Sequence, residues 1–234
     1  MTPLNRATKS MLTVFALTGL VAFSSCSKDD ENTTVNPDAT VKIVNVLPDA
    51  GDVNVYNGDN KLNSTAIGFG EATGYLSVAK GDATYSFKAT INGNTVLSAP
   101  VKFTSGNYSL FATGTTGDNS TVGVLTEDNL DAPASGKAKI RFVHASPDGP
   151  TVNFLVNDSL LNPNVGYKAA SAFKEMPAGT YTIKLNNSGS GETAISKTGV
   201  VLAAGKIYTV VAQGLVSPTP VIEQAFQLNV LSNN

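Results

Sequence analysis

The sequence predicts an all-β protein, in which two tandem immunoglobulin-like antiparallel β-sandwich domains follow a signal peptide and a flexible tether. Three observations predict this fold class. The composition combines 21 Gly and 11 Pro with no Trp, and its many Thr, Val and Asn residues favour short strands joined by turns. Apolar and polar residues alternate, which is the period of half-buried strands. One pattern of residues also occurs twice along the chain.

The chain begins with the features of a secretory signal peptide. Arg6 and Lys9 precede an apolar run at residues 11–23. This run is shorter than the roughly 20 residues that a membrane-spanning helix needs, and it has the size of a signal-peptide core. We expect residues 1–25 to be removed and to take no part in the fold.

A lipid anchor is expected directly after this segment. The residues Phe23-Ser24-Ser25-Cys26 resemble the lipobox of bacterial lipoproteins, although Phe23 stands where that pattern usually has Leu. The resemblance implies that Cys26 carries acyl chains such as palmitate, in which each buried methylene contributes about 0.8 kcal/mol to membrane binding. Cys26 is the only cysteine, so no disulfide can form within the chain. The alternative is a free thiol, with the signal peptide cleaved elsewhere.

The residues after the cysteine indicate where the anchored protein is exported. The run Lys28, Asp29, Asp30 and Glu31 is similar to the acidic export signal of surface lipoproteins in Bacteroidota. The resemblance implies a protein that is lipid-anchored in the outer membrane and exposed on the cell surface. The alternative is a solvated tether, which is the usual role of a short charge run. In both cases residues 26–39 form a lipidated tether with a flexible, polar end.

Two copies of one domain make up the rest of the chain, at residues 40–126 and 137–234. The linker between them, residues 127–136 (EDNLDAPASG), contains Pro, Gly and acidic residues. The copies match at offsets between 96 and 100 residues, as expected when strands keep their pattern and loops vary. The matched positions include Lys42-Ile43 with Lys139-Ile140, Pro48-Asp49 with Pro147-Asp148, Val53-Asn54-Val55 with Val152-Asn153-Phe154, Gly68-Phe69 with Gly166-Tyr167, Tyr75 with Phe173, and Tyr108 with Tyr208.

Each copy contains about seven or eight short runs with a period of two, which indicate strands of a sandwich. Signals such as Asn57-Gly58 and Asn92-Gly93 separate them and indicate hairpins. The run Tyr208-Thr209-Val210-Val211-Ala212 is apolar on both faces, which predicts a central strand. The clearest alternation in the first copy places on one face Tyr85, Phe87, Ala89 and Ile91.

Two local features of the copies allow more than one interpretation. Residues 168–176 could form a short helix in isolation, but their counterpart, residues 71–78, contains Gly74. We therefore expect a strand in both copies. A Gly precedes Tyr108 and Tyr208 by a few residues, which resembles the tyrosine corner of immunoglobulin-like sandwiches, where the hydroxyl group holds a crossover loop. The alternative is an ordinary core aromatic at each position.

The opening of the second copy carries a family resemblance. Residues 139–148, KIRFVHASPD, followed by Val152-Asn153-Phe154, resemble the signature of the domain of unknown function 4397 family. The later segments 177–181 and 203–212 fit the same family. The first copy differs, because its segment 44–49 is aligned as two residues shorter and lacks the His-Ala-Ser element. The resemblance implies an exported β-sandwich, often in tandem, with no agreed activity and no catalytic residues.

Composition and motifs argue against several functions. Without residues 1–25 the chain has 14 basic and 18 acidic residues, a net charge of 14 − 18 = −4, so nucleic acid is not an expected partner. His144, Ser146 and Asp148 lie too close in sequence to converge as a catalytic triad, and we expect a strand end and a turn there. One cysteine and one histidine cannot form a zinc site. We predict no enzyme activity, no cofactor and no metal.

Some residues remain as candidates for recognition. Tyr56 and Tyr167, near turns, are candidate ligand contacts, although core packing is the alternative for each. Asp158-Ser159-Leu160 resembles the motif at which Bacteroidota attach O-linked glycans, which makes Ser159 a candidate modification site. The leading hypothesis is a non-enzymatic surface module that binds a glycan or a protein. The alternatives are a structural spacer and a hydrolase that uses the loop at His144.

Overall fold

The computed structural model of the protein describes residues 39–219 and 223–234, and within these ranges it contains strands and no helix. Accordingly, none of the described segments is a helix with the length and hydropathy needed to cross a membrane. The predicted signal peptide, Cys26 and the acidic run at residues 28–31 lie outside the described residues.

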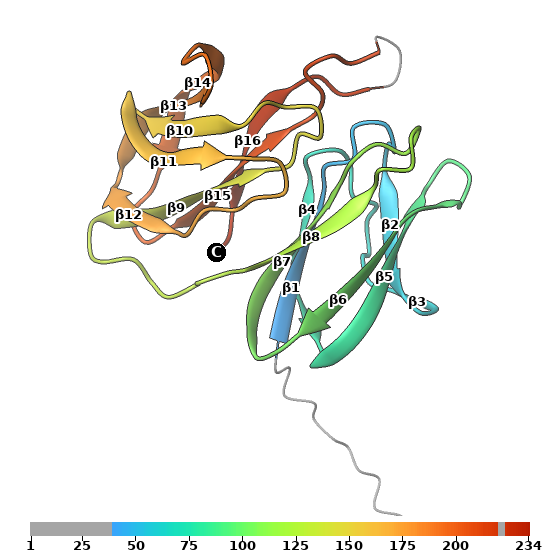
Figure 1. The fold of residues 1–234 in the computed structure, drawn as a ribbon. Helices are drawn as coiled ribbons and strands as arrows, with labels where there is room; N and C mark the ends of the chain where they lie inside the picture. The colour runs from blue at the N-terminus through green and yellow to red at the C-terminus, as the bar shows by residue number, and fades with distance from the viewer. Residues whose placement is uncertain (1–38, 220–222) are drawn as a thin grey trace, which may run out of the picture. The chain divides into compact units, whose positions relative to one another are not determined.

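The first sandwich is built from eight strands in two four-stranded sheets (Figure 1). We call the sheet with order β4-β1-β7-β8 the junction sheet and the sheet with order β3-β2-β5-β6 the outer sheet. The strands are β1 (Ala39–Asn45), β2 (Val53–Asn57), β3 (Asn60–Lys61), β4 (Ala72–Val78), β5 (Gly81–Ala89), β6 (Thr95–Phe103), β7 (Gly106–Thr113) and β8 (Val122–Glu127).

The second sandwich repeats this topology. Its junction sheet has the order β12-β9-β15-β16 and its outer sheet the order β11-β10-β13-β14. The all-β prediction with two sandwiches is therefore confirmed. The strands are β9 (Lys137–His144), β10 (Val152–Val156), β11 (Ser159–Val165), β12 (Lys174–Pro177), β13 (Gly179–Asn187), β14 (Thr193–Leu202), β15 (Ile207–Gln213) and β16 (Gln227–Ser232).

One strand pair in each junction sheet is parallel. The first strand of each copy lies between two later ones: β1 pairs in parallel with β7 and antiparallel with β4, and β9 does the same with β15 and β12. The other strand pairs are antiparallel. Turn signals mark only strands that follow each other in sequence, so they could not indicate this long-range parallel pairing.

Alternation along the strands fills a separate core in each sandwich. In β5, Tyr85, Phe87 and Ala89 are buried as predicted, but Ile91 is not, because the strand ends at Ala89 and the Ile91 side chain is 89% exposed. The first core includes Val41, Ile43, Val55, Phe87, Phe103 and Leu110. The second core includes Ile140, Phe142, Phe154, Ile183, Leu185 and Val210.

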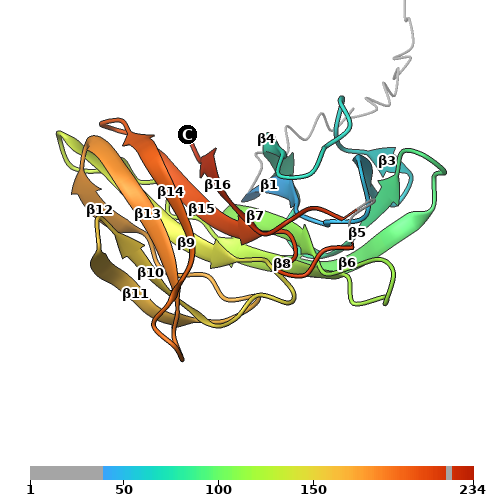
Figure 2. The same cartoon turned by 90° about the horizontal axis from the view of Figure 1, so that it is seen from above.

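Four strands are buried on both faces: β1, β7, β9 and β15. The central position predicted for residues 208–212 is confirmed. Their second faces are covered because the two junction sheets contact each other (Figure 2). We call this contact the junction, and it contains a third apolar cluster. The buried members of this cluster are Val44, Val46 and Phe111 from the first sandwich and Val143, Ala145 and Val211 from the second.

The strand registers correct the sequence alignment of the two copies. Asn45 pairs with Ala112 in the first sandwich, and His144 pairs with Ala212 in the second. Asn45 and His144 therefore occupy equivalent positions. The first copy is not two residues shorter, and the alignment of Lys42 with Lys139 was wrong: the residue equivalent to Lys42 is Arg141.

The hydroxyl groups of Tyr108 and Tyr208 hold crossover loops, which agrees with the first of the two interpretations left open by the sequence, while Tyr108 also belongs to the first apolar core. The Tyr108 hydroxyl lies 2.8 Å from Thr104 Oγ1, and the Tyr208 hydroxyl accepts a hydrogen bond from the Ala203 backbone N–H at 3.1 Å. Both partners lie where the chain passes from the outer sheet to the junction sheet, so each tyrosine fixes the connection that leads into its own strand.

Candidate functional site

The loop that follows β9 uses its reactive side chains for structure. The fully buried His144 donates from Nε2 to the Pro150 carbonyl at 2.9 Å, and its Nδ1 accepts from the Ser146 backbone N–H at 3.4 Å. Burial lowers the pKa of His144, and the hydrogen bond to Pro150 opposes that shift. The Ser146 hydroxyl donates to the Gly214 carbonyl at 2.6 Å. This arrangement leaves neither a free base nor a free nucleophile.

Asp148 and its counterpart Asp49 both fix a neighbouring loop. Asp148 accepts backbone hydrogen bonds from Val216 at 2.8 Å and Ser217 at 3.0 Å. Asp49 accepts from the backbone N–H of Thr116 at 2.7 Å. The two aspartates thus fix the loops that follow β15 and β7, which is a sufficient reason for an acidic residue at this position in both copies.

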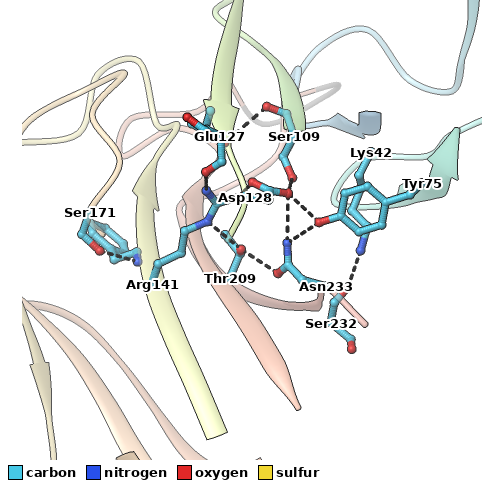
Figure 3. A network of polar contacts seen from close by, with 12 residues as sticks. Lys42, Tyr75, Ser109, Glu127, Asp128, Arg141, Ser171, Thr209, Ser232 and Asn233 are labelled. Atoms are coloured by element: carbon cyan, nitrogen blue, oxygen red, sulfur yellow. Dashed lines mark hydrogen bonds and ion pairs between the residues drawn. The ribbon is translucent and has the colours of Figure 1, made fainter. Parts of the chain in front are cut away.

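The junction holds a buried ion pair (Figure 3). Arg141 Nη2 lies 2.5 Å from Asp128 Oδ1, and the exposed fractions of the two side chains are 2% and 0%. Arg141 also donates to Thr209 Oγ1 at 2.9 Å and to the Glu127 carbonyl at 3.1 Å. A buried pair of this kind is tolerable only because hydrogen bonds satisfy both charged groups.

Further polar side chains complete the network around Asp128. Its Oδ2 accepts hydrogen bonds from the Tyr75 hydroxyl at 2.5 Å and the Ser109 hydroxyl at 2.6 Å. Asn233 donates to the Tyr75 hydroxyl at 2.9 Å, and Lys42 donates to the Ser232 carbonyl. Figure 3 shows these groups meeting from both sandwiches around one carboxylate.

The network is arranged with approximate two-fold symmetry. The cation of each copy donates to the carbonyl at the end of the other copy's last strand: Lys42 to Ser232, and Arg141 to Glu127. Each cation also lies over an aromatic ring of its own copy, at 4.8 Å for Lys42 over Tyr75 and 4.5 Å for Arg141 over Phe173. The equivalent pairs are Lys42 with Arg141, Tyr75 with Phe173, Ser109 with Thr209, Glu127 with Ser232, and Asp128 with Asn233.

Burial controls the protonation of this network. It lowers the pKa of Lys42, while the Asp128 carboxylate opposes that shift. It also raises the pKa of Tyr75, and Asp128 adds to the rise by charge repulsion and by accepting the hydroxyl proton. Because Tyr75 remains neutral, the junction balances the charges of Lys42 and Arg141 against a single carboxylate.

The two candidate aromatic contacts lie in different settings. Both rings are partly exposed and each has a lysine over one face: Lys88 Nζ lies 4.7 Å from the centroid of Tyr56, and Lys168 Nζ lies 5.1 Å from that of Tyr167. Tyr56 lies in β2 of the outer sheet. Tyr167 lies beside the junction, in the loop between β11 and β12.

A hollow of about 340 Å³ lies beside Tyr167. The loop after β7 supplies Thr115 and Asp118 to its wall, and the second sandwich supplies Asp148, Tyr167 and Lys168. The Tyr167 hydroxyl itself is buried, beside the Thr113 side chain. The hollow therefore combines an aromatic ring, two carboxylates and an ammonium group, which is a set of groups that can bind a small polar ligand.

The other predicted site residues do not join this hollow. Ser159 is exposed at the start of β11, after a turn in which Asn157 and Asp158 have φ values of 47° and 63°. Within the described ranges, no three His, Cys, Asp or Glu side chains converge in a way that could hold a metal ion.

Sequence reasoning missed the residues of the junction. Lys42 and Arg141 each interrupt an apolar strand with a charge, and Asp128 lies in a segment whose composition predicted a linker. A charged residue on an otherwise apolar strand was the available signal. It indicates that the second face of the strand is covered by a partner that can neutralise the charge.

Two solved structures show a weak similarity to the chain. One solved structure that resembles the chain is a carbohydrate-binding module of family CBM26 from Eubacterium rectale Amy13K, in complex with maltoheptaose, at 12% identity and a TM-score of 0.24. It covers 80% of this chain and 99% of its own. Another is the fimbrial anchor protein Mfa2 from Porphyromonas gingivalis, at 9% identity and a TM-score of 0.21, covering 82% and 96%. No curated protein matches the chain.

The family comparison covers both sandwiches. The model of the domain of unknown function DUF4397 matches residues 39–153 and again residues 138–233. These two segments together span all sixteen strands of the structure. The chain therefore belongs to the DUF4397 family and contains two copies of its domain.

Proposed function

We propose that this protein is a non-enzymatic lipoprotein of the cell envelope, anchored in the outer membrane through Cys26 and exposed on the cell surface. There its two sandwiches act together as one module that binds a glycan or a protein. The observation that carries the binding role is the junction, which joins the sandwiches through buried contacts and has an open polar hollow beside Tyr167. Such hollows between domains are frequent ligand sites.

The loop at His144 supports a non-enzymatic role. A hydrolase would need His144 as a base, but its Nε2 is bound to a backbone carbonyl and the ring is fully buried. Purified mature protein should therefore show no turnover of esters, peptides or glycosides. Turnover that is lost in a folded His144→Asn variant would contradict the proposal and favour a hydrolase.

The anchor can be tested in cells. We expect Cys26→Ser to abolish incorporation of a labelled palmitate analogue and to release the protein from the membrane fraction, whereas Ser24→Ala should leave both unchanged. Membrane retention of unlabelled Cys26→Ser would contradict lipidation at this residue. Replacing Asp29, Asp30 and Glu31 with the matching amides should keep the protein anchored but protect it from protease added to intact cells.

A structural spacer is the second candidate function. The observation that favours it is the same junction, because buried contacts between the sandwiches hold them at a fixed separation. A thermal-shift screen of the mature chain against glycans, calcium and cell-envelope extracts separates the two roles. A reproducible rise in melting temperature identifies a binding module and its ligand class. A flat response across the panel favours the spacer.

Ser159 is proposed as an attachment site for an O-linked glycan. Its exposure and its position after a turn support the proposal. Protein purified from the native host should carry added mass on the peptide that contains Ser159, and Ser159→Ala should remove it. An unmodified peptide from the native host would contradict the assignment.

A further inference from the structure

The two ends of the junction differ although the network between them is nearly symmetric. At one end the described part of the connection from β15 to β16 contacts the first sandwich, since the Gln224 backbone N–H donates to the Pro48 carbonyl at 3.0 Å. Asn229 donates to the Gly70 carbonyl at 2.6 Å, and a Cβ atom at Gly70 would lie 2.6 Å from Gln213 Nε2. This end is filled.

The hollow lies at the equivalent end. There the loop from β7 to β8 covers residues 114–121, so it is five residues shorter than its counterpart at 214–226. The position equivalent to Gly70 is Lys168, since their backbone N–H groups bond to the equivalent carbonyls of Asn45 and His144. A shorter loop leaves the space open, and Lys168 and Tyr167 line it.

Lys168 occupies a backbone conformation that suits glycine. Its φ is 69°, while Gly70 in the first copy has a φ of 78°. A side chain in the left-handed region costs conformational energy, and such strain concentrates at functional sites. In return the ammonium group is placed at the hollow, over the Tyr167 ring. Within the described ranges Lys168 forms no ion pair that would explain its presence.

The carboxylates of the hollow are held in place by hydrogen bonds, Asp118 from its own loop and Asp148 from the loop after β15. Asp118 Oδ1 accepts from Thr115 Oγ1 at 2.5 Å and from the Ser120 backbone N–H at 3.0 Å. Asp148 is held by the backbone of residues 216 and 217. A carboxylate has about four acceptor positions, so each can still accept hydrogen bonds from a ligand without moving.

We propose that this hollow binds one end of a neutral glycan. Sugar hydroxyl groups would donate to Asp118 and Asp148 and accept from Lys168, and the C–H face of the ring would contact Tyr167 and the side chain of Leu215. Two carboxylates and one ammonium give the lining a charge of −1, which disfavours acidic sugars. This inference rests on the proposed binding function and specifies its site and ligand class.

The test is titration calorimetry on the mature chain from Ser27 onward. The probes are di- and trisaccharides of glucose, galactose, mannose and N-acetylglucosamine, with galacturonic acid oligomers as the anionic counterpart. We expect a neutral saccharide to bind, and Tyr167→Ala to weaken that binding by about tenfold or more. Tyr56→Ala removes the other candidate aromatic and should leave the affinity unchanged.

Lys168→Gly gives a readout that separates binding from folding. Because glycine adopts this backbone conformation without strain, the variant should melt at a higher temperature than the wild type while binding the saccharide several-fold more weakly. A destabilised protein would lose both properties together. Higher stability with unchanged affinity would show that Lys168 does not contact the ligand, and would overturn the site.

The remaining outcomes separate the site from the function. If a neutral glycan binds equally well to wild type and Tyr167→Ala, the binding function stands and the hollow is not its site. If galacturonic acid oligomers bind more tightly than neutral ones, the assigned ligand class is wrong. If no saccharide binds but an envelope protein raises the melting temperature, the module binds protein and this inference is overturned.

Discussion

At the scale of single residues, the two copies use different side chains for the same structural purpose. Asn45 donates from Nδ2 to the carbonyls of Gly51 and Ile67, at 3.0 and 2.9 Å, where His144 donates to Pro150. Each side chain lies at the end of its strand and satisfies backbone carbonyl groups of the surrounding loops. The difference is that an imidazole can take up a proton and an amide cannot.

His144 should make folding stability dependent on pH. Burial lowers its pKa in the folded state, so the unfolded chain, with a histidine pKa of about 6.5, binds the proton first as the pH falls. The stabilisation is complete above that pH and is lost below it, by at most about 1.4 kcal/mol per pH unit. His144→Asn, which copies Asn45, should reduce the loss between pH 7 and 5 in urea unfolding. Equal losses in both proteins would contradict the assignment.

Only part of the role of these residues could be predicted from the sequence. Residue types such as Ser146, Pro147 and Asp148 indicated a turn after His144, and the structure places a loop there. The role of Lys42 and Arg141 could not be predicted in the same way, because it depends on which surface covers the second face of β1 and β9. That surface belongs to the other copy, where the partner of Lys42, Ser232, lies 190 residues away in sequence, so no local pattern indicates it.

At the scale of elements, hairpin signals and alternation predicted the positions of the strands along the chain better than they predicted which strands pair with each other. Asn57-Gly58 does lie at the turn between β2 and β3, with a φ of 58° at Gly58. The parallel pairing of β1 with β7 was not predictable, because it joins strands separated by most of the sandwich. Residues 168–176 were expected as a strand, and their last part forms β12 at Lys174–Pro177.

The tyrosines that hold the crossover loops should contribute through their hydroxyl groups. Tyr108→Phe and Tyr208→Phe keep the ring but lose the hydrogen bonds to Thr104 and Ala203. We expect each change to lower the free energy of unfolding by about 1 kcal/mol. Chemical denaturation measures this, with Tyr56→Phe as the control, because the contact between Lys88 and the Tyr56 ring needs no hydroxyl. Losses no larger than in the control would leave only the packing role of the rings.

At the scale of the whole molecule, the ion pair of the junction should be the most sensitive point. Asp128→Asn removes the carboxylate that pairs with Arg141 and leaves a buried charge uncompensated, which typically costs about 3–5 kcal/mol. Adding Arg141→Met should recover much of that loss, since a buried pair is often replaceable by apolar groups. Glu175→Gln breaks the exposed pair with Lys137 and should cost about 1 kcal/mol or less. A similar small loss for Asp128→Asn would contradict the buried network.

The junction should also make the two sandwiches unfold together. Their apolar cluster and polar network join them in one unit, so calorimetry of the mature chain should show a single transition. Asp128→Asn weakens the contact without touching either core, and should split the transition into two. Two transitions in the wild type would mean that each sandwich is stable without the other. The linker composition of residues 127–136 gave no sign of this coupling, because it describes the backbone of a connection and not the surfaces that it joins.

The approximate symmetry of the junction means that each sandwich carries a face that fits a copy of itself. A self-complementary face needs no separately shaped partner, so duplicating one domain supplies both halves of the contact at once. A short peptide connection then holds the faces at a high effective concentration, which is independent of how many protein molecules are present. Two separate domains would pair in this way only at a high protein concentration. Two domains in one chain can pair at any expression level.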